Sequence, residues 1–186
     1  TMSDDIRPEL AGLQERLQRT GDEVRSEAQA KRHARGYRTA RENLADLVEL
    51  DSFTEYGQLA VAAQRNRRDY DELQSKTAAD GVITGIGLVN GQRTAVVVYD
   101  YGVLAGTQGF FHHKKLDRIF ELAEEWELPV IMYTEGGGGR PGDTDVTVQI
   151  AGLNITSFAT WARLSGQVPR IAVNNGYCFA GNAALF

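Results

Sequence analysis

Four consecutive glycines at positions 136–139 constrain this chain more than any other feature of its sequence. They follow an apolar run at 129–133, which is short enough for a buried strand, and precede an apolar-periodic segment at 146–164 that predicts a helix. Glycine permits positive φ and lets a ligand approach the main chain closely. Such a loop can aim peptide N–H groups at a phosphate or at an oxyanion that forms during a reaction. A flexible surface loop is the alternative, but the end of a buried strand is a common place for a site.

The composition predicts a folded protein of one domain, although two small domains are possible at 186 residues. With 42% hydrophobic and 24% charged residues, the chain can bury a sizeable core. A net charge of −5 without a basic stripe argues against nucleic-acid binding. The apolar runs are too short to span a bilayer, and Asp4 and Asp5 stand where a signal peptide would be basic and then apolar. We therefore expect a cytoplasmic protein with neither a membrane nor a nucleic-acid partner.

The first 78 residues predict a helical segment and a polar connector. A narrow apolar seam within residues 1–35 marks a helix that packs on the domain body or on another subunit. The members of this seam are Ile6, Leu10, Leu13, Leu17, Val24 and Ala28. Thr39 and Glu42 form the capping box of a short second helix. The inward side chains of that helix are predicted to be Leu44, Leu47, Val48 and Leu50. Residues 65–76 are polar and indicate a solvated connector.

From Asp80 onward the chain has β character. Two β-rich runs flank Asn90-Gly91, which is the strongest short-range signal for a hairpin. Gly85-Ile86-Gly87 does not begin a dinucleotide fingerprint, because Gly91 falls one residue late and a hairpin stands where a helix is needed. A loop of small residues at 100–109 then leads into a predicted helix at 110–127. The inner face of this helix is expected to carry Leu116, Ile119, Phe120 and Ala123.

The C-terminal part predicts another buried strand at 170–174, a second small-residue loop at 175–182 and a helix that opens at 183–186. An apolar helix one turn long has nothing to cover it. We therefore expect this chain to be the N-terminal piece of a longer protein.

The order ββαβαβα, with glycine-rich loops after two successive parallel strands, resembles the α/β crotonase-like (ClpP/crotonase) fold. The motifs are similar to those of the carboxyltransferase (β-type) component of biotin-dependent acyl-CoA carboxylases, the propionyl- and methylcrotonyl-CoA carboxylase family. The similar segments are 36–55, 80–85, 90–91, 100–109, 137–140, 164–171 and 176–181. The resemblance implies a helical N-terminal segment and connector at 1–78. It also implies an N-terminal crotonase-like carboxyltransferase domain at 79–186, truncated at its C-terminal end.

Three departures from the family pattern indicate a divergent branch and leave the acyl-chain preference open. Glu135-Gly136 replaces the Asp-Ser that precedes the family's glycines. Pro141-Gly142-Asp143 follows the arginine, and Asn182 enters near the second loop.

The resemblance also implies a reaction, in which a carboxyl group moves from carboxybiotin on a carrier domain to the α-carbon of an acyl-CoA. The thioester carbonyl becomes an enolate, whose oxygen two backbone N–H groups can stabilise. The implied catalytic positions are Gly137, Gly138 and Gly139 for one donor, and Phe179, Ala180 and Gly181, at the start of a helix, for the other. The released biotin is the implied base. Glu135 and Asp143 are the other candidates, although they are more readily explained as carboxylates of surface loops.

Five further residues are candidate contacts of the CoA substrate: Gly106, Thr107, Lys114, Lys115 and Arg140. Support of the glycine loop is the favoured role of Arg140.

Other reactive side chains in this region receive structural roles. His112 and His113 are expected on a helix surface, because neither has the spacing of a metal motif, and no metal is expected. Cys178, the single cysteine, excludes an intramolecular disulfide and a cysteine-based zinc site. Its packing is favoured over a nucleophilic role, because no histidine partner is evident.

The implied partners are an acyl-CoA, the biotin carboxylase and biotin carrier components or domains, and further copies of the chain in a homo-oligomer. Two crotonase-like halves from different subunits face each other in that family, so this half alone would be inactive. A crotonase-type acyl-CoA hydratase or decarboxylase shares the oxyanion hole and stays open as an alternative. A non-catalytic scaffold half-domain also stays open, and binding of CoA would separate it from both enzymes. A phosphate-binding NTPase is excluded by the absence of its motif.

Overall fold

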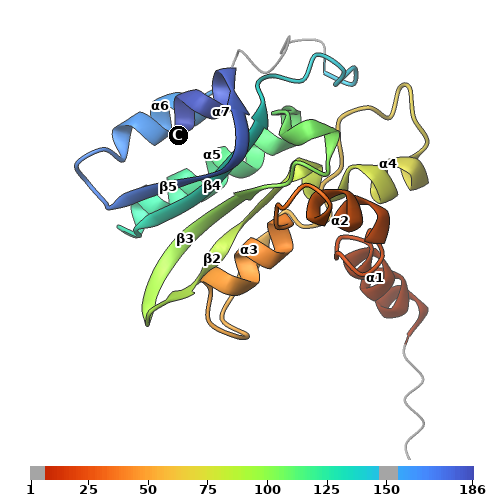
Figure 1. The fold of residues 1–186 in the computed structure, drawn as a ribbon, viewed down its shortest axis with the longest axis horizontal. Coiled ribbons are helices and arrows are strands. Elements are labelled where there is room, and N and C mark those ends of the chain that lie inside the picture. The colour runs from red at the N-terminus through yellow and green to blue at the C-terminus, as the bar shows by residue number, and fades with distance from the viewer. Residues whose placement is uncertain (1–6, 147–154) are drawn as a thin grey trace, which may run out of the picture.

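The structure, a computed structural model, describes residues 7–146 and 155–186 (Figure 1). Within that part of the chain, one mixed sheet has the strand order β1-β2-β3-β4-β5. Its strands are β1 (Thr54–Tyr56), β2 (Val82–Val89), β3 (Gln92–Tyr99), β4 (Val130–Gly137) and β5 (Arg170–Phe179). The first three strands are antiparallel, whereas β4 and β5 continue the sheet in parallel to β3. The fold is mixed α/β, as predicted.

Helices cover both faces of the sheet (Figure 1). They are α1 (Pro8–Gln18), α2 (Ser26–His33), α3 (Ala40–Leu47), α4 (Tyr70–Lys76), α5 (Phe110–Glu125), α6 (Ser157–Arg163) and α7 (Ala180–Leu185). Two short 3₁₀ turns, η1 (Ala78–Gly81) and η2 (Leu104–Gly106), precede β2 and α5. In the described part of the chain, no helix has the length and apolar character needed to cross a membrane.

The hairpin of β2 and β3 confirms the prediction from Asn90-Gly91. Asn90 and Gly91 have φ of 50° and 75°, the positive values that a two-residue turn of this kind requires. Gly85 is a packing position, because a Cβ there would lie 2.3 Å from the Thr54 carbonyl oxygen and 2.4 Å from the Phe53 ring. The structure therefore agrees with the rejection of a dinucleotide motif.

The main core lies between the sheet and the helices α5 and α6. The predicted inner face of α5 is confirmed, because Leu116, Ile119, Phe120 and Ala123 are fully buried. The smaller core on the opposite face joins α3 to β2 and β3. Burial of these apolar faces is what holds the layers together.

Helix α3 begins where the capping box predicts and ends before its predicted end. The Thr39 hydroxyl accepts a hydrogen bond from the Glu42 N–H, and the Glu42 carboxylate accepts one from the Thr39 N–H. Leu44 is buried, but Leu50 is 92% exposed, so its predicted inward position is wrong. The physical reason is that the backbone becomes extended at Val48, which breaks the helical period before Leu50.

The N-terminal segment differs from one continuous helix. A turn separates α1 from α2, and Leu10 and Leu13 of the predicted seam are 42% and 43% exposed. Leu10 and Leu13 therefore do not pack on the described body of the domain, whereas Leu17 and Ala28 of the same seam are half-buried. The expected connector contains a helix, α4. The boundary between residues 78 and 79 stays a prediction, although β1 joins the first part to the sheet.

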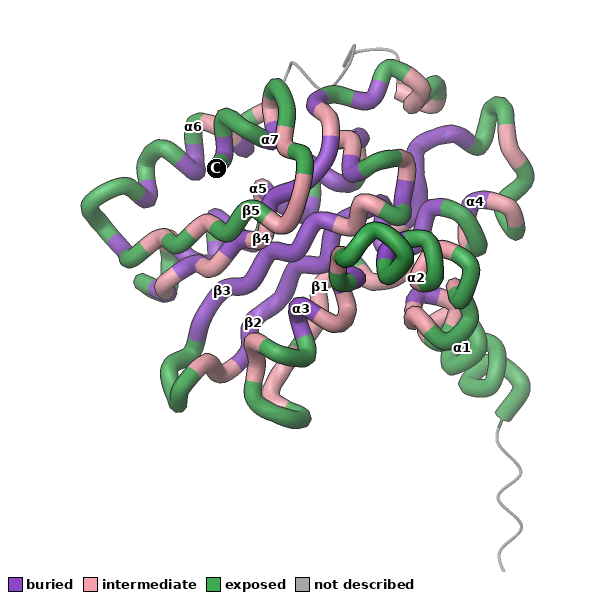
Figure 2. The backbone as a smooth tube through the Cα atoms, viewed as in Figure 1, coloured by how far each residue is buried: buried purple, intermediate pink, exposed green. Residues whose placement is uncertain are grey.

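The C-terminal elements also differ in extent from the predicted ones. The predicted helix at 146–164 is observed only as α6, and residues 147–154 lie outside the described residues. Strand β5 was expected to be buried, but it lies at the edge of the sheet with Ile171, Tyr177 and Phe179 more than half exposed (Figure 2). The prediction is wrong because a run of apolar residues does not reveal whether both faces of a strand are covered. Helix α7 begins at Ala180, before the predicted start.

Candidate functional site

The two predicted glycine loops meet at the carboxyl ends of the neighbouring strands β4 and β5. Strands β4 and β5 run in parallel, with Gly136 opposite Cys178 and Gly137 opposite Phe179. Just beyond the strands, a Cβ built on Gly138 would lie 2.9 Å from the Cβ of Ala180. The structure thus places both sets of predicted catalytic positions side by side.

A third loop, from η2 to Gln108, packs against the four glycines. The Gln108 N–H donates to the Gly138 carbonyl at 2.7 Å, and the Gln108 carbonyl accepts from the Arg140 N–H at 2.9 Å. The main chain at Gly136 packs directly against the main chain at Ala105 and Gly106, since a Cβ on Gly136 would lie 2.3 Å from the Ala105 carbonyl oxygen. Gly106, a predicted CoA contact, therefore serves here to let two main chains touch.

The main chain at Gly137 is open. No heavy atom of the described structure lies within 4 Å of the position that a Cβ on Gly137 would occupy. Outside the ladder of β4 and β5, the described residues show no hydrogen bond donated by the N–H groups of Gly138 and Gly139, and the first turn of α7 has no side-chain cap. The position that a side chain at Gly137 would occupy is therefore open to a ligand.

Arg140 supports the loop, as favoured from the sequence. Its side chain is 5% exposed and forms an ion pair with Asp80, which is fully buried. Its Nε donates to the Thr107 hydroxyl at 3.1 Å, and its Nη2 donates to the Thr107 carbonyl at 2.6 Å. These contacts occupy both Arg140 and Thr107 within the protein. Their predicted contact with CoA stays a prediction.

The expectation that Glu135 and Asp143 are surface carboxylates is wrong. Their side chains are 3% and 7% exposed. Glu135 is paired with Arg32, whereas Asp143 accepts a hydrogen bond from the Phe110 N–H at 2.8 Å at the start of α5. Burial raises the pKa of Glu135 above its ordinary value, against the opposing effect of the Arg32 guanidinium. Both carboxylates are thus engaged by the protein itself.

His112 and His113 are buried, so their predicted place on a helix surface is also wrong. The reason is that η1 and α6 cover the flanks of α5. The His112 N–H donates to Asp80 at 2.8 Å, and His113 Nδ1 lies 3.2 Å from the Ser157 hydroxyl. Burial lowers the pKa of both rings, that of His113 to about 4. Both imidazoles are therefore neutral near pH 7, and the described residues contain no cluster of three metal-ligating side chains.

The two lysines of α5 point in different directions. The Lys115 ammonium is buried and donates to the carbonyls of Ala79 and Val82. Burial lowers the pKa of Lys115 to about 8. Lys114 is exposed above the Phe110 ring, so a phosphate contact stays a prediction for Lys114, whereas the Lys115 ammonium faces the protein interior.

Cys178 lies beside the candidate site, opposite Gly136 in the sheet. Burial raises the pKa of its thiol, which keeps the thiol protonated. This environment agrees with a packing role.

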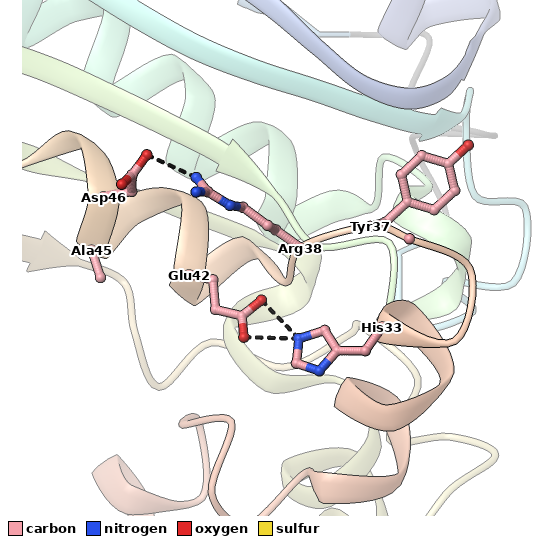
Figure 3. A pocket seen from close by; sticks show the side chains of 7 residues that line it. His33, Tyr37, Arg38, Glu42, Ala45 and Asp46 are labelled. Carbon is pink, nitrogen blue, oxygen red and sulfur yellow. Dashed lines mark hydrogen bonds and ion pairs between the residues drawn. The ribbon is translucent and has the colours of Figure 1, made fainter.

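Two hollows of the described surface lie away from the predicted glycines. One, of about 750 Å³, lies between α2 and α3 (Figure 3). Its charged groups are already paired, His33 with Glu42 at 2.8 Å and Arg38 with Asp46 at 2.7 Å. A second, largely apolar hollow of about 610 Å³ lies between residues 59–63 and the start of α5. We place the candidate site at the glycine loops because the open main-chain donors are there.

Sequence reasoning did not identify Asp80, Arg32 or Gln108, all of which hold the glycine loops. Asp80 and Arg32 bind residues far away in the chain, Arg140 and Glu135. The sequence shows only two arginines seven residues apart, Arg25 and Arg32, and no local pattern that indicates their carboxylate partners.

Comparison with known proteins agrees with this arrangement. The carboxyl transferase domain family matches residues 31–185. The biotin-dependent long chain acyl-coenzyme A carboxylase beta4 subunit of Mycobacterium tuberculosis is 33% identical over 179 residues, covering 92% of this chain and 31% of that protein. This chain therefore spans about a third of the length of that curated relative.

Two solved structures have the same fold. A single-chain, multi-domain long-chain acyl-CoA carboxylase is 50% identical, with a TM-score of 0.89 over 96% of this chain and 18% of that chain. Transcarboxylase 12S, a hexamer with hydrolysed methylmalonyl-coenzyme A bound, is 26% identical, with a TM-score of 0.76 over 97% of this chain and 34% of that chain. This chain belongs to the carboxyl transferase domain family and has the crotonase-like carboxyltransferase fold.

Proposed function

We propose that this chain is part of the carboxyltransferase component of a biotin-dependent acyl-CoA carboxylase. In this reaction a carboxyl group passes from carboxybiotin to the α-carbon of an acyl-CoA. Membership of the family supports the reaction type, and the coenzyme A compound bound to transcarboxylase 12S supports an acyl-CoA as the ligand. Carboxybiotin would supply the carboxyl group when bound, and no residue of this chain is assigned to it.

The observation that carries the proposal is the open main chain at Gly137, next to N–H groups of Gly138 and Gly139 that donate to no described group outside the β4–β5 ladder. A thioester carbonyl that reaches this point would bring its oxygen to main-chain donors. Ala180 and the start of α7 lie on the other side of the same opening and would provide the second donor. Because negative charge grows on that oxygen as the enolate forms, each donor stabilises the transition state by roughly 2.7–4 kcal/mol.

The base is not assigned to this chain. Glu135 and Asp143, the two candidate carboxylates, are held by Arg32 and by the start of α5. Neither is free to accept a proton from an acyl-CoA. We therefore propose that the proton leaves with a group outside this chain, and the released biotin is the candidate.

The assembly is proposed from the relatives alone. The partners would be biotin carboxylase and biotin carrier components or domains, together with further copies of this chain, in a cytoplasmic homo-oligomer with the active site between subunits. The exposed face of β5 beside the glycine loops is consistent with such an arrangement. The acyl chain of the substrate is left unassigned.

The substitution Gly137→Ala tests the site. The added methyl group enters open space and meets no protein atom, so we expect the folded structure to be kept. It would stand where the thioester approaches, and we expect kcat/KM for carboxyl transfer to fall by roughly 10²-fold, as after loss of one donor. The measurement is transfer of labelled carboxyl groups from bicarbonate and ATP to acyl-CoA by the native enzyme.

Gly12→Ala is the matched control, because a Cβ on Gly12 of α1 also meets nothing within 4 Å. Its activity should stay at the wild-type level. Carboxyl transfer that survives Gly137→Ala unchanged would place the site elsewhere. CoA binding accompanied by hydration, or by net decarboxylation alone, would favour the crotonase-type alternative. A wild-type protein that binds no CoA would favour a scaffold.

A further inference from the structure

We propose that Arg32 and Glu135 are positioning residues, which fix the four-glycine loop by a buried ion pair between α2 and β4. The effect on catalysis rests on the proposed function, whereas the effect on the loop does not. Glu135 directly precedes the glycines, and Arg32 lies 103 residues earlier in the chain. The N-terminal segment would thus control the geometry of the candidate oxyanion site.

The guanidinium of Arg32 is fully engaged. Its Nη1 and Nη2 donate to the two carboxylate oxygens of Glu135 at 2.6 and 2.8 Å. Its Nε and Nη2 also donate to the Arg38 carbonyl at 3.1 and 3.0 Å. The rings of Tyr37 and Tyr101 lie 5.0 and 5.4 Å from its central carbon. A bidentate pair with stacked rings fixes direction as well as distance, which a lysine could not do.

Glu135 in turn holds both glycine loops. The register of β4 against β5 shifts between Thr134 and Gly136, so Glu135 occupies the irregular position. Its carboxylate fills the place of a side chain at Gly176, where a Cβ would lie 2.3 Å from Oε1. Its carbonyl accepts a hydrogen bond at 2.7 Å from Asn182 of α7. One residue therefore connects α2, the end of β4, strand β5 and helix α7.

A second pair repeats the arrangement. Arg25 precedes α2 by one residue and forms an ion pair at 2.6 Å with Asp100, which follows β3. Arg25 is the N-cap residue of α2, seven residues before Arg32. Since β3 and β4 are parallel neighbours, their carboxyl ends meet at one edge of the sheet. Helix α2 is thus tied to both strand ends beside the site.

A run of four glycines needs such external support. Glycine has the largest conformational freedom of any residue, so the loop cannot hold one conformation by itself. Arg140 fixes it on the downstream side through Asp80 and Thr107. The Arg32–Glu135 pair is the corresponding restraint on the upstream side. A small displacement of the donors is enough to reduce catalysis strongly.

The chain offers a matched control pair, Arg41 and Glu55. These residues form another bidentate, largely buried ion pair, with side chains 21% and 9% exposed. It joins α3 to β1, and β2 and β3 separate β1 from β4. Loss of this pair affects stability without touching the glycine loop.

The test compares Arg32→Lys and Glu135→Gln with Arg41→Lys and Glu55→Gln in the native enzyme. We expect both members of the first pair to lower kcat by roughly tenfold to 10²-fold, more than they change KM. The double variant should lose no more than the worse single variant, because the two residues act as one unit. The control variants should keep kcat near the wild-type value while lowering Tm by a similar amount.

Hydrogen exchange gives a readout that does not depend on activity. We expect amides at 134–140 to exchange faster in Arg32→Lys than in Arg41→Lys. Two results together would overturn the proposal. One is that Arg32→Lys leaves the exchange rates of amides 134–140 unchanged. The other is that, for a given fall in Tm, kcat falls by the same amount in the variants of both ion pairs. If Glu135→Gln fails to fold, Arg32→Lys, which keeps the positive charge, decides the question. A wild-type enzyme without carboxyl transfer would refute the proposed function, while the exchange comparison would still decide the role of the ion pair.

Discussion

Individual glycines of this chain have different structural roles. Gly85 leaves space for the Phe53 ring and the main chain of Thr54. Gly136 lets the end of β4 pack directly against the main chain of Ala105. At Gly137, in contrast, an added Cβ would meet nothing within 4 Å, so the main chain is open there. A count of glycines in the sequence cannot separate these cases, because each depends on what lies opposite.

His113 provides a prediction of pH dependence at the scale of a residue. Burial lowers the pKa of His113 from 6.5 to about 4, so between these values the unfolded chain binds more protons than the folded one. The contribution of His113 to stability is therefore complete above about pH 6.5 and declines as the pH falls toward 4. At pH 5 the loss is on the order of 2 kcal/mol.

The measurement is the free energy of unfolding in urea at pH 7 and pH 5, for the wild type and His113→Asn. We expect the variant to lose less stability than the wild type over this range, because the substituted side chain does not titrate. An equal loss in both proteins would show that His113 does not contribute.

At the scale of elements, the helix α3 shows how a local signal fixes the start of a helix. Replacing Thr39 by Ala removes the hydroxyl that accepts the Glu42 N–H, and also its hydrogen bond to Asp22. We expect a loss of about 1–2 kcal/mol in the free energy of unfolding. Thr39→Ser keeps the hydroxyl and should recover most of the loss. Equal stability of the Ala and Ser variants would contradict a capping role.

At the scale of the whole molecule, the outer strand β5 leaves apolar side chains uncovered. Ile171 and Val173 are 53% and 37% exposed and lie beside Ile131 and Tyr133 of β4. A contiguous apolar surface of this kind favours association. Figure 2 shows the contrast with the buried strands β2 and β3.

We therefore expect this chain to self-associate, and the double variant Ile171→Thr/Val173→Thr to shift it toward the monomer. Threonine keeps the β-branched shape that a strand prefers. Sedimentation velocity over a range of concentrations measures the change. Leu50→Thr is the control, because Leu50 is 92% exposed as a single apolar residue on another element. The same distribution for the wild type and the double variant would refute association through this face.

The sequence by itself determined the features that depend on neighbours in the chain. The Asn90-Gly91 turn, the Thr39–Glu42 capping box and the inner face of α5 are all confirmed. The order of the glycine motifs was enough to indicate the family and its fold. Such signals are readable because turn geometry, capping and helical period act over a few residues.

Only the tertiary structure decided what covers each element and which distant charges meet. His112, His113 and Lys115 are buried because α5 is covered on its flanks as well as on its apolar face, and periodicity reports only the apolar face. The apolar run of β5 is exposed because nothing in the described chain covers its outer side. The Arg32–Glu135 contact spans 103 residues, and it exists because the folded chain brings α2 to the carboxyl end of β4. Long-range contacts of this kind leave no local pattern in a sequence.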